Sequence, residues 1–369
     1  MNFDFAQVLT TMVEREASDV HLTPGVPPMM RDKGRVEAIE GFPVLTPQDT
    51  RETVYSILND AQRKRFENEL QLDFAYAIPG VARFRVNCFF QRGSISAAFR
   101  LIPSKIKDLR TLGLPAVLEE FTRKPRGFVL VTGPTGSGKS TTLASMIDMI
   151  NAERAEHILT IEDPIEFLHR HRRCIVNQRE IGTDAVDFAT ALRAALREDP
   201  DVILVGEMRD LETISTALTA AETGHLVFAT LHTQSTAQTV DRIIDVFPAH
   251  QQSQVRMQLT IALQGIVTQQ LIPTADGNGR VVACEVLVPT PAIRNLIREG
   301  KTHQIYSSLQ TSGNVGMQTM DSHLAQLVRM GKISQAMAEQ RASMPDELRR
   351  LLGGAPGGQA AAMAGAGQM

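Results

Sequence analysis

The sequence has few cysteines, no long apolar run and no excess of basic residues. Its three cysteines, Cys88, Cys174 and Cys284, are too far apart in the chain to form a CxxC pair, so free thiols in a reducing cytoplasm are expected. No apolar stretch approaches the roughly 18 residues that a membrane-spanning helix needs. The first residues also lack the basic and apolar regions of a signal peptide. We therefore expect a cytoplasmic protein that reaches a membrane only through a partner.

The charge balance is close to neutral. The 369 residues include 38 Lys and Arg against 41 Asp and Glu, a formal net charge of −3. A domain that follows nucleic acid usually has a basic excess, so no nucleic-acid partner is expected, although a local basic face is compatible with this total. Apolar residues make up 43%, which is ordinary for a globular protein. The length is sufficient for two or three domains, each with its own core.

The N-terminal third has the pattern of a small α+β domain, placed at residues 1–102. Apolar residues recur at helical spacing near the start, and a helical stretch at 46–69 precedes several alternating, strand-like runs. Residues 103–115 have proline at both ends and a glycine inside, which favours a linker.

Residues 116–290 show a different pattern, which is typical of a parallel sheet with crossover helices. Short apolar runs are separated mostly by helical stretches, and they lie at Gly127–Thr132, His157–Ile161, Asp201–Val205, Leu226–Thr230 and Val281–Val288. Residues 291–352 are predicted to be mostly helical. Residues 353–369 contain only Gly, Ala, Pro, Gln and Met, a composition that cannot bury a core and predicts a disordered tail.

A phosphate-binding motif lies at the start of the second region. Residues 133–140 match the pattern GxxxxGK[ST], between a predicted strand and a predicted helix. Its glycines allow backbone N–H groups to converge on a phosphate, and the helix N-terminus adds partial positive charge. Lys139 can reach the β- and γ-phosphates, and the Ser140 hydroxyl can ligate Mg²⁺. The predicted nucleotide-binding residues are Pro134, Thr135, Gly136, Ser137, Gly138, Lys139, Ser140 and Thr141.

Acidic residues follow two of the predicted buried strands. In an open parallel sheet, both groups would lie at the carboxyl edge beside the phosphate loop. Asp163 precedes a proline and suits a helix N-cap, so Glu166 and Glu207 are the candidates for orienting water and binding the metal. Gly206 stands where an Asp commonly precedes such a glutamate, so this segment alone is a weak match to the common Walker B motif.

Two histidines, His225 and His232, flank the predicted strand Leu226–Thr230. They could sense the γ-phosphate or a neighbouring subunit, or they could be hydrogen-bonded structural histidines, and their spacing leaves both interpretations open. No cysteine or acidic cluster completes a metal site around them.

Taken together, these segments resemble the secretion ATPase superfamily. The phosphate loop, Ile161–Glu166, Asp201–Arg209 and Thr223–Thr233 are similar, in this order, to its Walker A motif, Asp box, Walker B motif and His box, and that superfamily has the Gly-Glu pair seen at Gly206. Four further segments resemble the type IV pilus retraction ATPases of this superfamily, and they are Ala17–Leu22, Arg83–Asn87, Ala292–Glu299 and Gly316–Asp321. The resemblance covers residues 1 to about 350.

The resemblance implies an α/β fold, with a RecA-like phosphate-loop core, a smaller PAS-like N-terminal domain and a C-terminal helical region. It also implies a homohexameric ring that hydrolyses ATP with Mg²⁺ and powers pilus retraction and twitching motility. An inner-membrane platform protein is the expected partner, a second retraction ATPase is a further candidate, and the location is peripheral at the inner membrane. The segment Ala292–Glu299 is similar to one that this family needs for retraction.

The resemblance also implies roles for individual residues. Glu166 would be the general base that orients water, and Glu207 would hold Mg²⁺ through water together with Ser140. The residues expected to act in catalysis are Lys139, Glu166, Glu207, His225 and His232, with Arg85 and Arg100 reaching the phosphates from the N-terminal domain.

Four alternatives remain. Pilus-extension and type II secretion ATPases usually carry additional N-terminal domains and a four-cysteine zinc site, which the scattered cysteines cannot form. An accessory retraction ATPase is a close relative. A RecA-like nucleic-acid motor is disfavoured by the charge. A nucleotide-binding scaffold with little hydrolysis is disfavoured by the presence of both Glu166 and Glu207.

Overall fold

The computed structural model describes residues 3–32, 35–79, 81–103 and 105–353. The chain forms two compact units, and each is described by itself. The first contains the residues up to Ile106 together with Pro164–Leu168, and the second contains Lys107–Asp163 and the residues from His169 onward.

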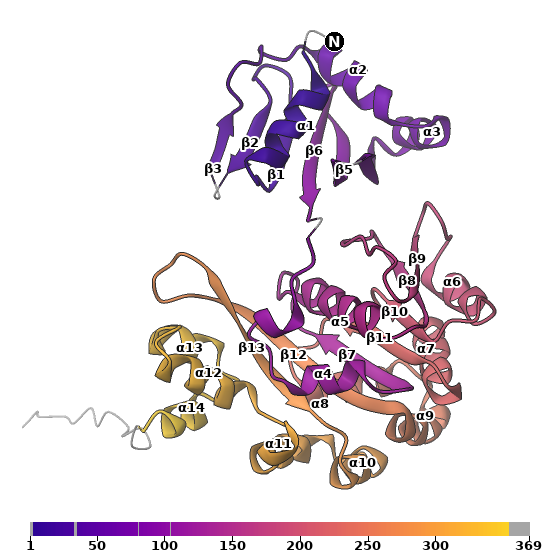
Figure 1. Ribbon diagram of the computed structural model, residues 1–369, viewed down its shortest axis with the longest axis vertical. Helices are drawn as coiled ribbons and strands as arrows, with labels where there is room; N and C mark the ends of the chain where they lie inside the picture. The colour runs from indigo at the N-terminus through magenta and orange to yellow at the C-terminus, as the bar shows by residue number, and fades with distance from the viewer. Residues whose placement is uncertain (1–2, 33–34, 80, 104, 354–369) are drawn as a thin grey trace, which may run out of the picture. The chain divides into compact units, whose positions relative to one another are not determined.

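The N-terminal unit is built on a six-stranded antiparallel sheet with the strand order β3-β2-β1-β6-β5-β4 (Figure 1). One face of the sheet packs against helices α1 to α3 in a shared apolar core. Successive side chains of a strand point to opposite faces of the sheet, so alternate apolar residues form this core. In β5, for example, Phe84 and Val86 are buried in it while Arg85 is exposed. The elements are α1 (Phe5–Glu14), β1 (Asp19–Leu22), β2 (Met29–Asp32), β3 (Arg35–Ala38), α2 (Pro47–Ile57), α3 (Asp60–Glu69), β4 (Gln71–Ile78), β5 (Ala82–Gln91) and β6 (Ser94–Ile102).

The helical stretch predicted at residues 46–69 is two helices rather than one. Thr46 and Asp49 form a capping box at the start of α2, and Asn59 and Gln62 form another at the start of α3. Leu58 is extended, so α2 ends there and the second capping box starts a new helix.

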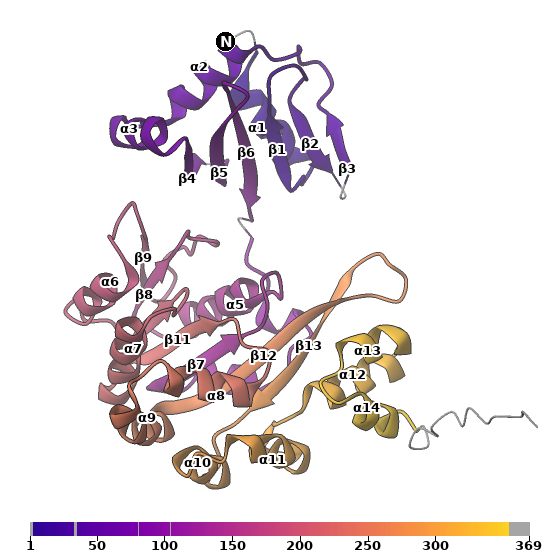
Figure 2. The ribbon, with the colours of Figure 1, turned by 180° about the vertical axis from the view of Figure 1, so that it is seen from behind.

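The second unit contains a seven-stranded sheet with the order β13-β12-β7-β11-β10-β8-β9 (Figures 1 and 2). All paired strands are parallel except β13, which runs antiparallel to β12. Two strands, β9 and β12, were not among those predicted. The strands are β7 (Gly127–Thr132), β8 (His157–Glu162), β9 (Ile175–Glu180), β10 (Val202–Val205), β11 (Leu226–Leu231), β12 (Leu263–Pro273) and β13 (Arg280–Leu287).

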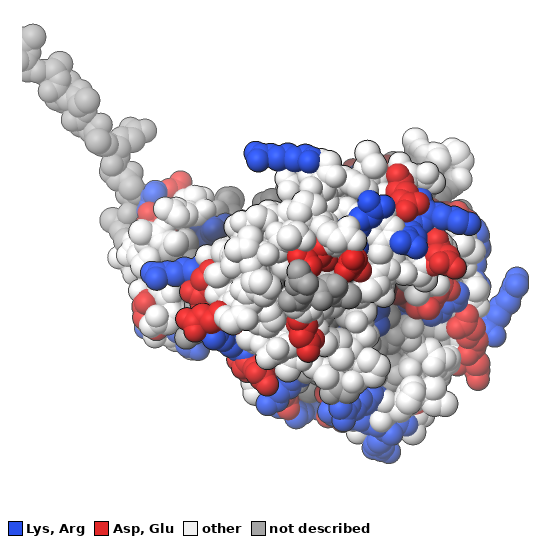
Figure 3. Space-filling model, turned by 90° about the horizontal axis from the view of Figure 1, so that it is seen from above, with Lys and Arg blue, Asp and Glu red and all other residues white. Residues whose placement is uncertain are grey.

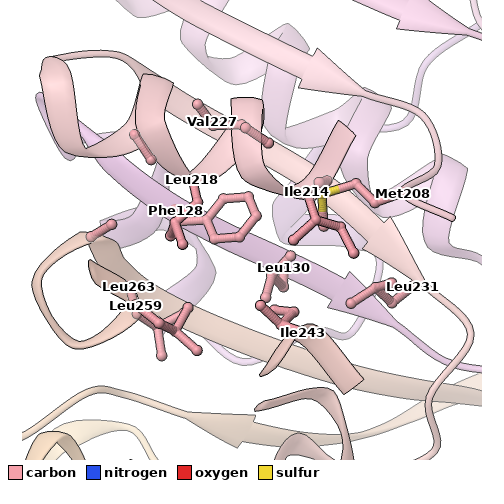
Figure 4. Close-up of a cluster of buried hydrophobic side chains, with 14 of the residues drawn as sticks. Phe128, Leu130, Met208, Ile214, Leu218, Val227, Leu231, Ile243, Leu259 and Leu263 are labelled. Atoms are coloured by element: carbon pink, nitrogen blue, oxygen red, sulfur yellow. The ribbon is translucent and has the colours of Figure 1, made fainter. Parts of the chain in front are cut away.

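Helices cover both faces of this sheet, because successive strand residues point to opposite sides. Phe128 and Leu130 face one helical layer, formed by α6 to α9. Figure 4 shows these two side chains among those of α7, α8 and α9. Val129 and Val131 face the other layer, formed by α4 and α5. The helices are α4 (Val117–Thr122), α5 (Lys139–Glu153), α6 (Phe188–Ala195), α7 (Leu211–Thr223), α8 (Thr236–Asp245) and α9 (Ala249–Ala262), with a 3-10 turn η1 at Leu109–Thr111.

The remaining described residues form a helical region. Its last helices pack on β12 and β13 through a small apolar cluster that includes Ile272, Ala283 and Leu324. The elements are α10 (Pro291–Arg298), α11 (Ile305–Thr311), α12 (Met320–Arg329), α13 (Gln335–Arg341) and α14 (Pro345–Leu351), with 3-10 turns η2 (Thr302–Gln304) and η3 (Gly313–Val315). The predicted fold class, an α/β core with a smaller α+β unit before it and helices after it, is confirmed.

Two predicted segments extend beyond the described residues. The predicted tail at 353–369 lies outside them except for Gly353, and the predicted linker at 103–115 includes one such position, 104. From Lys107 onward the linker belongs to the second unit, where the Ser145 hydroxyl donates to the Lys107 carbonyl oxygen at 2.7 Å. Within the described ranges, no helix is both long and apolar enough to cross a membrane. On the face drawn in Figure 3, basic and acidic side chains are interspersed.

Candidate nucleotide site

The phosphate loop connects the end of β7 to the first turn of α5. Gly133, Gly136 and Gly138 have φ values of +137°, +78° and +91°, in the region that favours glycine. At Gly133 no side chain fits, because a Cβ atom there would lie 2.2 Å from the backbone oxygen of Gln269. The backbone conformation of the loop therefore depends on glycine and on the neighbouring strand β12.

Gln269 of β12 holds the loop in place from behind. Its Nε2 donates to the Ser137 carbonyl oxygen at 2.8 Å, and its Oε1 accepts from the Thr142 hydroxyl at 3.0 Å. The side chain is buried, so these bonds are shielded from water. Sequence reasoning missed this residue, although a polar side chain within the apolar run of β12 is a usable signal, because burying it unpaired is costly.

The Lys139 ammonium group lies over the loop itself. Its Nζ donates to the carbonyl oxygens of Gly133 at 2.8 Å and Pro134 at 3.2 Å. Lys139 opens helix α5, so the ammonium group and the N-terminal N–H groups of α5 lie at one end of the same helix. An anionic phosphate group at this position would meet both.

A second polar cluster lies at the same carboxyl edge of the sheet. Glu207 follows β10, which is two strands, or about 10 Å, from β7. Its Oε2 accepts from Arg209 at 2.6 Å, and its Oε1 is 2.9 Å from Nε2 of His232, which follows β11. Burial raises the pKa of Glu207, but the hydrogen bond and charge of Arg209, with those of His232, outweigh it and leave the pKa below its usual value. Glu207 is therefore an ionised acceptor, and Arg209 is a contact that sequence reasoning missed.

Close packing of two strands explains the glycine before Glu207. A Cβ atom at Gly206 would lie 3.1 Å from the Ile161 carbonyl oxygen and 3.2 Å from Cα of Glu162. The end of β10 thus lies close against the end of β8, and a side chain here would require the Ile161–Glu162 backbone to move by a few tenths of an ångström. This close approach favours glycine over Asp at position 206.

The structure separates the two histidines of the predicted His box. His225 precedes β11 and His232 follows it, so the six residues of the strand lie between them and the two histidines are about 23 Å apart along the chain. Nδ1 of His225 is 3.0 Å from the Ala220 carbonyl oxygen, at the amino edge of the sheet. Within one chain, His232 is therefore brought to the phosphate-loop edge and His225 is not.

A pocket of about 490 Å³ opens beside the first turn of α5. Its apolar side chains come from the residues that follow η1 on one side and from β12 and β13 on the other, and Lys107 and Arg280 add positive charge. A volume of this size accommodates a base and its sugar. The lining residues are Lys107, Thr111, Leu112, Leu114, Gly138, Thr141, Thr142, Gln269, Leu271, Gly279, Arg280 and Val282.

The predicted arginines lie in register on the N-terminal sheet. Arg85 of β5 is the cross-strand partner of Arg100 of β6, and Arg100 is the partner of Asp19 of β1. Nε of Arg100 donates to Oδ1 of Asp19 at 2.8 Å. Burial raises the pKa of Asp19, but bonds from Ser18 and Arg100 and the charge of Arg100 outweigh it, so the pKa is lowered. The Arg100 side chain is still 68% exposed.

The residues at the phosphate-loop edge fit a magnesium ion. Among the described residues, no three His, Cys, Asp or Glu side chains cluster so as to hold a metal by themselves. Mg²⁺ bound with a nucleotide needs only one or two protein oxygens in addition to phosphates and water. The Ser140 hydroxyl, in the first turn of α5, and the carboxylate of Glu207 at the same sheet edge are oxygens of this kind, and their binding of the ion stays a prediction. Glu166 belongs to the segment Pro164–Leu168 of the other unit, so its role toward the phosphate loop stays a prediction.

The mostly parallel sheet has a phosphate loop that Gln269 holds in place, and an acid–histidine pair lies at the same edge. These features define a phosphate-loop nucleotide-binding protein. Residues 74–343 match the model of the family described as type II/IV secretion system protein. The chain belongs to this family.

Individual relatives cover nearly the whole chain. PilT of Pseudomonas aeruginosa, a type IV pilus retraction ATPase, is 54% identical over 93% of this chain and 99% of its own length. The type IV pilus ATPase PilU of the same species is 44% identical over 95% of this chain and 91% of its own. A crystal structure of the pilus retraction motor PilT with bound ADP has a TM-score of 0.89 at 51% identity, and covers 94% of this chain and 99% of that one.

Proposed function

We propose that this protein is an ATP-hydrolysing hexameric motor that powers type IV pilus retraction, and with it twitching motility. The observation that carries the proposal is the phosphate loop with Glu207 and His232 at the same sheet edge. The similarity to PilT over almost the full length of both chains selects retraction among the activities of the family.

In the proposed mechanism, the β- and γ-phosphates lie in the loop, where backbone N–H groups and Lys139 hold them. The nucleobase occupies the adjoining pocket, between the apolar side chains of Leu112 and Leu271. Mg²⁺, when bound, neutralises charge on these phosphates, and Ser140 and Glu207 are its protein partners. Glu166 orients the attacking water, and His232 responds to the γ-phosphate; its bond to Glu207 at the phosphate-loop edge supports this role.

Arg85 and Arg100 act, in this proposal, on ATP that is bound by another copy of the chain in the hexamer. A loose phosphoryl transition state spreads negative charge that an arginine from outside the phosphate loop can stabilise. Arg85→Ala and Lys139→Ala should each be nearly inactive alone, and exchange of subunits between the two should restore some turnover. If labelled chains verify exchange and no mixing ratio restores activity, Arg85 does not act in trans.

A retraction motor must transmit its motion to the pilus machine. We propose that the ring docks on an inner-membrane platform protein and is peripheral at that membrane. A second retraction ATPase, of the kind that PilU represents, is a further candidate partner.

Deletion of the gene, followed by counts of surface pili and a twitching assay, tests this function. Loss of a retraction motor should give hyperpiliated cells without twitching, and the wild-type gene should reverse both effects. Bald cells would instead identify an extension ATPase and overturn the proposal.

A further inference from the structure

A buried carboxyl group connects three elements behind the His232 loop. Glu285 lies in the middle of β13 and is 2% exposed. Its Oε1 accepts from the backbone N–H and from the hydroxyl of Thr236, both at 2.7 Å. The backbone of Met320, at the start of α12, also hydrogen-bonds this carboxyl group. Glu285 thus joins β13 to the first residue of α8 and the first residue of α12.

The contact with Thr236 fixes one end of a short loop. Residues 232–235 connect β11 to α8, and Thr236 is the first residue of that helix. The Ser235 hydroxyl caps the backbone N–H of Gln238, so the N–H of Thr236 is left to Glu285. A carboxylate at this place is also favoured by the partial positive charge of the helix N-terminus. The start of α8, four residues after His232, is therefore held from the strand behind it.

A second contact fixes the same loop closer to His232. The Thr233 and Thr239 hydroxyls are 2.7 Å apart, and Thr239 donates to the Ser235 carbonyl oxygen at 2.8 Å. The loop is thus tied to α8, and α8 is tied to Glu285. A shift of the helix start would move the loop with it, and the 2.9 Å contact of His232 with Glu207 is sensitive to such a shift.

Packing alone does not explain a carboxyl group at position 285. Ala283 and Leu287, which share its face of the strand, are apolar and fully buried, so an apolar side chain would fill this position at lower desolvation cost. Burial indeed raises the pKa of Glu285, with opposing contributions from its bonds to Thr236. What the carboxyl group adds is a specific set of hydrogen bonds to the start of α8.

We infer that Glu285 is a positioning residue for catalysis: by holding the start of α8, it places His232 against Glu207. The inference rests on the proposed function, in which His232 responds to the γ-phosphate. Glu285 itself lies behind the loop and acts only through it.

Three variants of the full-length protein test this inference, and they are Glu285→Gln, Thr236→Val and Thr236→Ser. Glu285→Gln keeps the volume, but it replaces one carboxylate oxygen by an NH₂ group and leaves Thr236 with an uncharged, weaker acceptor. Thr236→Val removes the hydroxyl, and Thr236→Ser keeps it. We expect Glu285→Gln and Thr236→Val to lower kcat about tenfold, the scale of one hydrogen bond to a charged group, with KM for MgATP within about twofold. Thr236→Ser, which keeps the hydroxyl, should have a kcat within about twofold of the wild type.

Two controls separate positioning from loss of structure. Val286→Ala, on the same strand, should lower the melting temperature and leave kcat unchanged at a temperature where the protein is folded. In a His232→Ala background, Glu285→Gln should lower kcat by less than about twofold further, since residues that act through one another are not additive. If Glu285→Gln lowers kcat by the same factor in both backgrounds, or leaves kcat unchanged in the wild-type background, the inference is wrong. An unchanged kcat in His232→Ala alone would remove the proposed role of His232 and the inference with it.

Discussion

Replacing Gln269 by alanine should weaken nucleotide binding, although this side chain belongs to a strand behind the site. The change removes the donor to the Ser137 carbonyl oxygen and the acceptor of the Thr142 hydroxyl. A buried polar group without a partner costs about 1–3 kcal/mol. Thr142 can turn its hydroxyl to the carbonyl oxygen of Gly138 one turn earlier in α5, so the Ser137 oxygen accounts for most of the loss. A loss of about 2 kcal/mol from the free energy of ADP binding raises the Kd for ADP roughly 30-fold.

Equilibrium binding of a fluorescent ADP analogue, with a thermal melt of each variant, measures this effect. Gln270→Ala is the matched control, because the next residue of the strand points to the opposite face of the sheet. Gln269→Glu is the more specific variant, since it keeps an acceptor for Thr142 and turns a carboxylate oxygen toward the Ser137 oxygen. We expect both Gln269 variants to bind ADP more weakly and Gln270→Ala to bind it normally. Unchanged Kd values in both Gln269 variants would refute the idea that β12 shapes the phosphate loop.

The remaining predictions concern the residue that orients the attacking water, helix α10 and the pH dependence of stability. Glu166→Gln should bind ATP yet hydrolyse it at least roughly 100-fold more slowly in single-turnover assays; normal turnover at saturation with lost affinity would make Glu166 a binding residue. Arg294→Ala should keep much of its ATPase activity but fail to restore twitching, because Arg294 donates at 3.1 Å to the Leu263 carbonyl oxygen, at the edge of the sheet opposite the phosphate loop; a dead ATPase in an intact ring would contradict this. Ile297→Ala should also block twitching, and it should lower the free energy of unfolding by about 2–5 kcal/mol in denaturant titrations, because Ile297 is fully buried. Burial disfavours the charged form of His323 and lowers its pKa below 6.5, so the stability that this residue contributes is fully present above pH 6.5 and falls below it by up to about 1.4 kcal/mol per pH unit. His323→Asn should reduce that slope in melts between pH 7.5 and 5.5, and an identical slope would contradict the assignment.

The apolar runs of the sequence predicted most of the parallel sheet, because strands that are buried on both faces consist of nearly continuous apolar residues. Strand β12 could not be predicted in this way. Helix α9 ends at Ala262 and β12 begins at Leu263, with no turn residue between them. The change from helix to strand follows from pairing with β7, a tertiary contact that local sequence does not record. Strand β9 is an edge strand with polar residues in its second half, so it lacks the apolar run as well.

The candidate site was partly predictable for related reasons. The phosphate loop has a local pattern, so its residues could be read directly from the sequence. The rule that strand ends share one edge predicted that Glu207 lies near the phosphate loop, but its contact with His232, from a second strand, was not predicted. Gln269 and Glu285 left a signal, namely a polar residue inside an apolar strand, but their partners 132 and 49 residues away could be found only in the fold. His225 shows the limit of a motif, since the same pattern spans both edges of the sheet.

The central claim is that the phosphate loop of this chain drives ATP turnover. Phosphate release by purified rings of the wild type and of Lys139→Ala, at saturating MgATP, tests it most directly. The wild type should turn over ATP, and Lys139→Ala should lose turnover, because its ammonium group no longer contacts the phosphates. The variant also loses the bonds to the carbonyl oxygens of Gly133 and Pro134, so the control is an intact ring with a melting temperature above the assay temperature. Normal turnover by folded Lys139→Ala rings would contradict the claim that this loop drives ATP turnover.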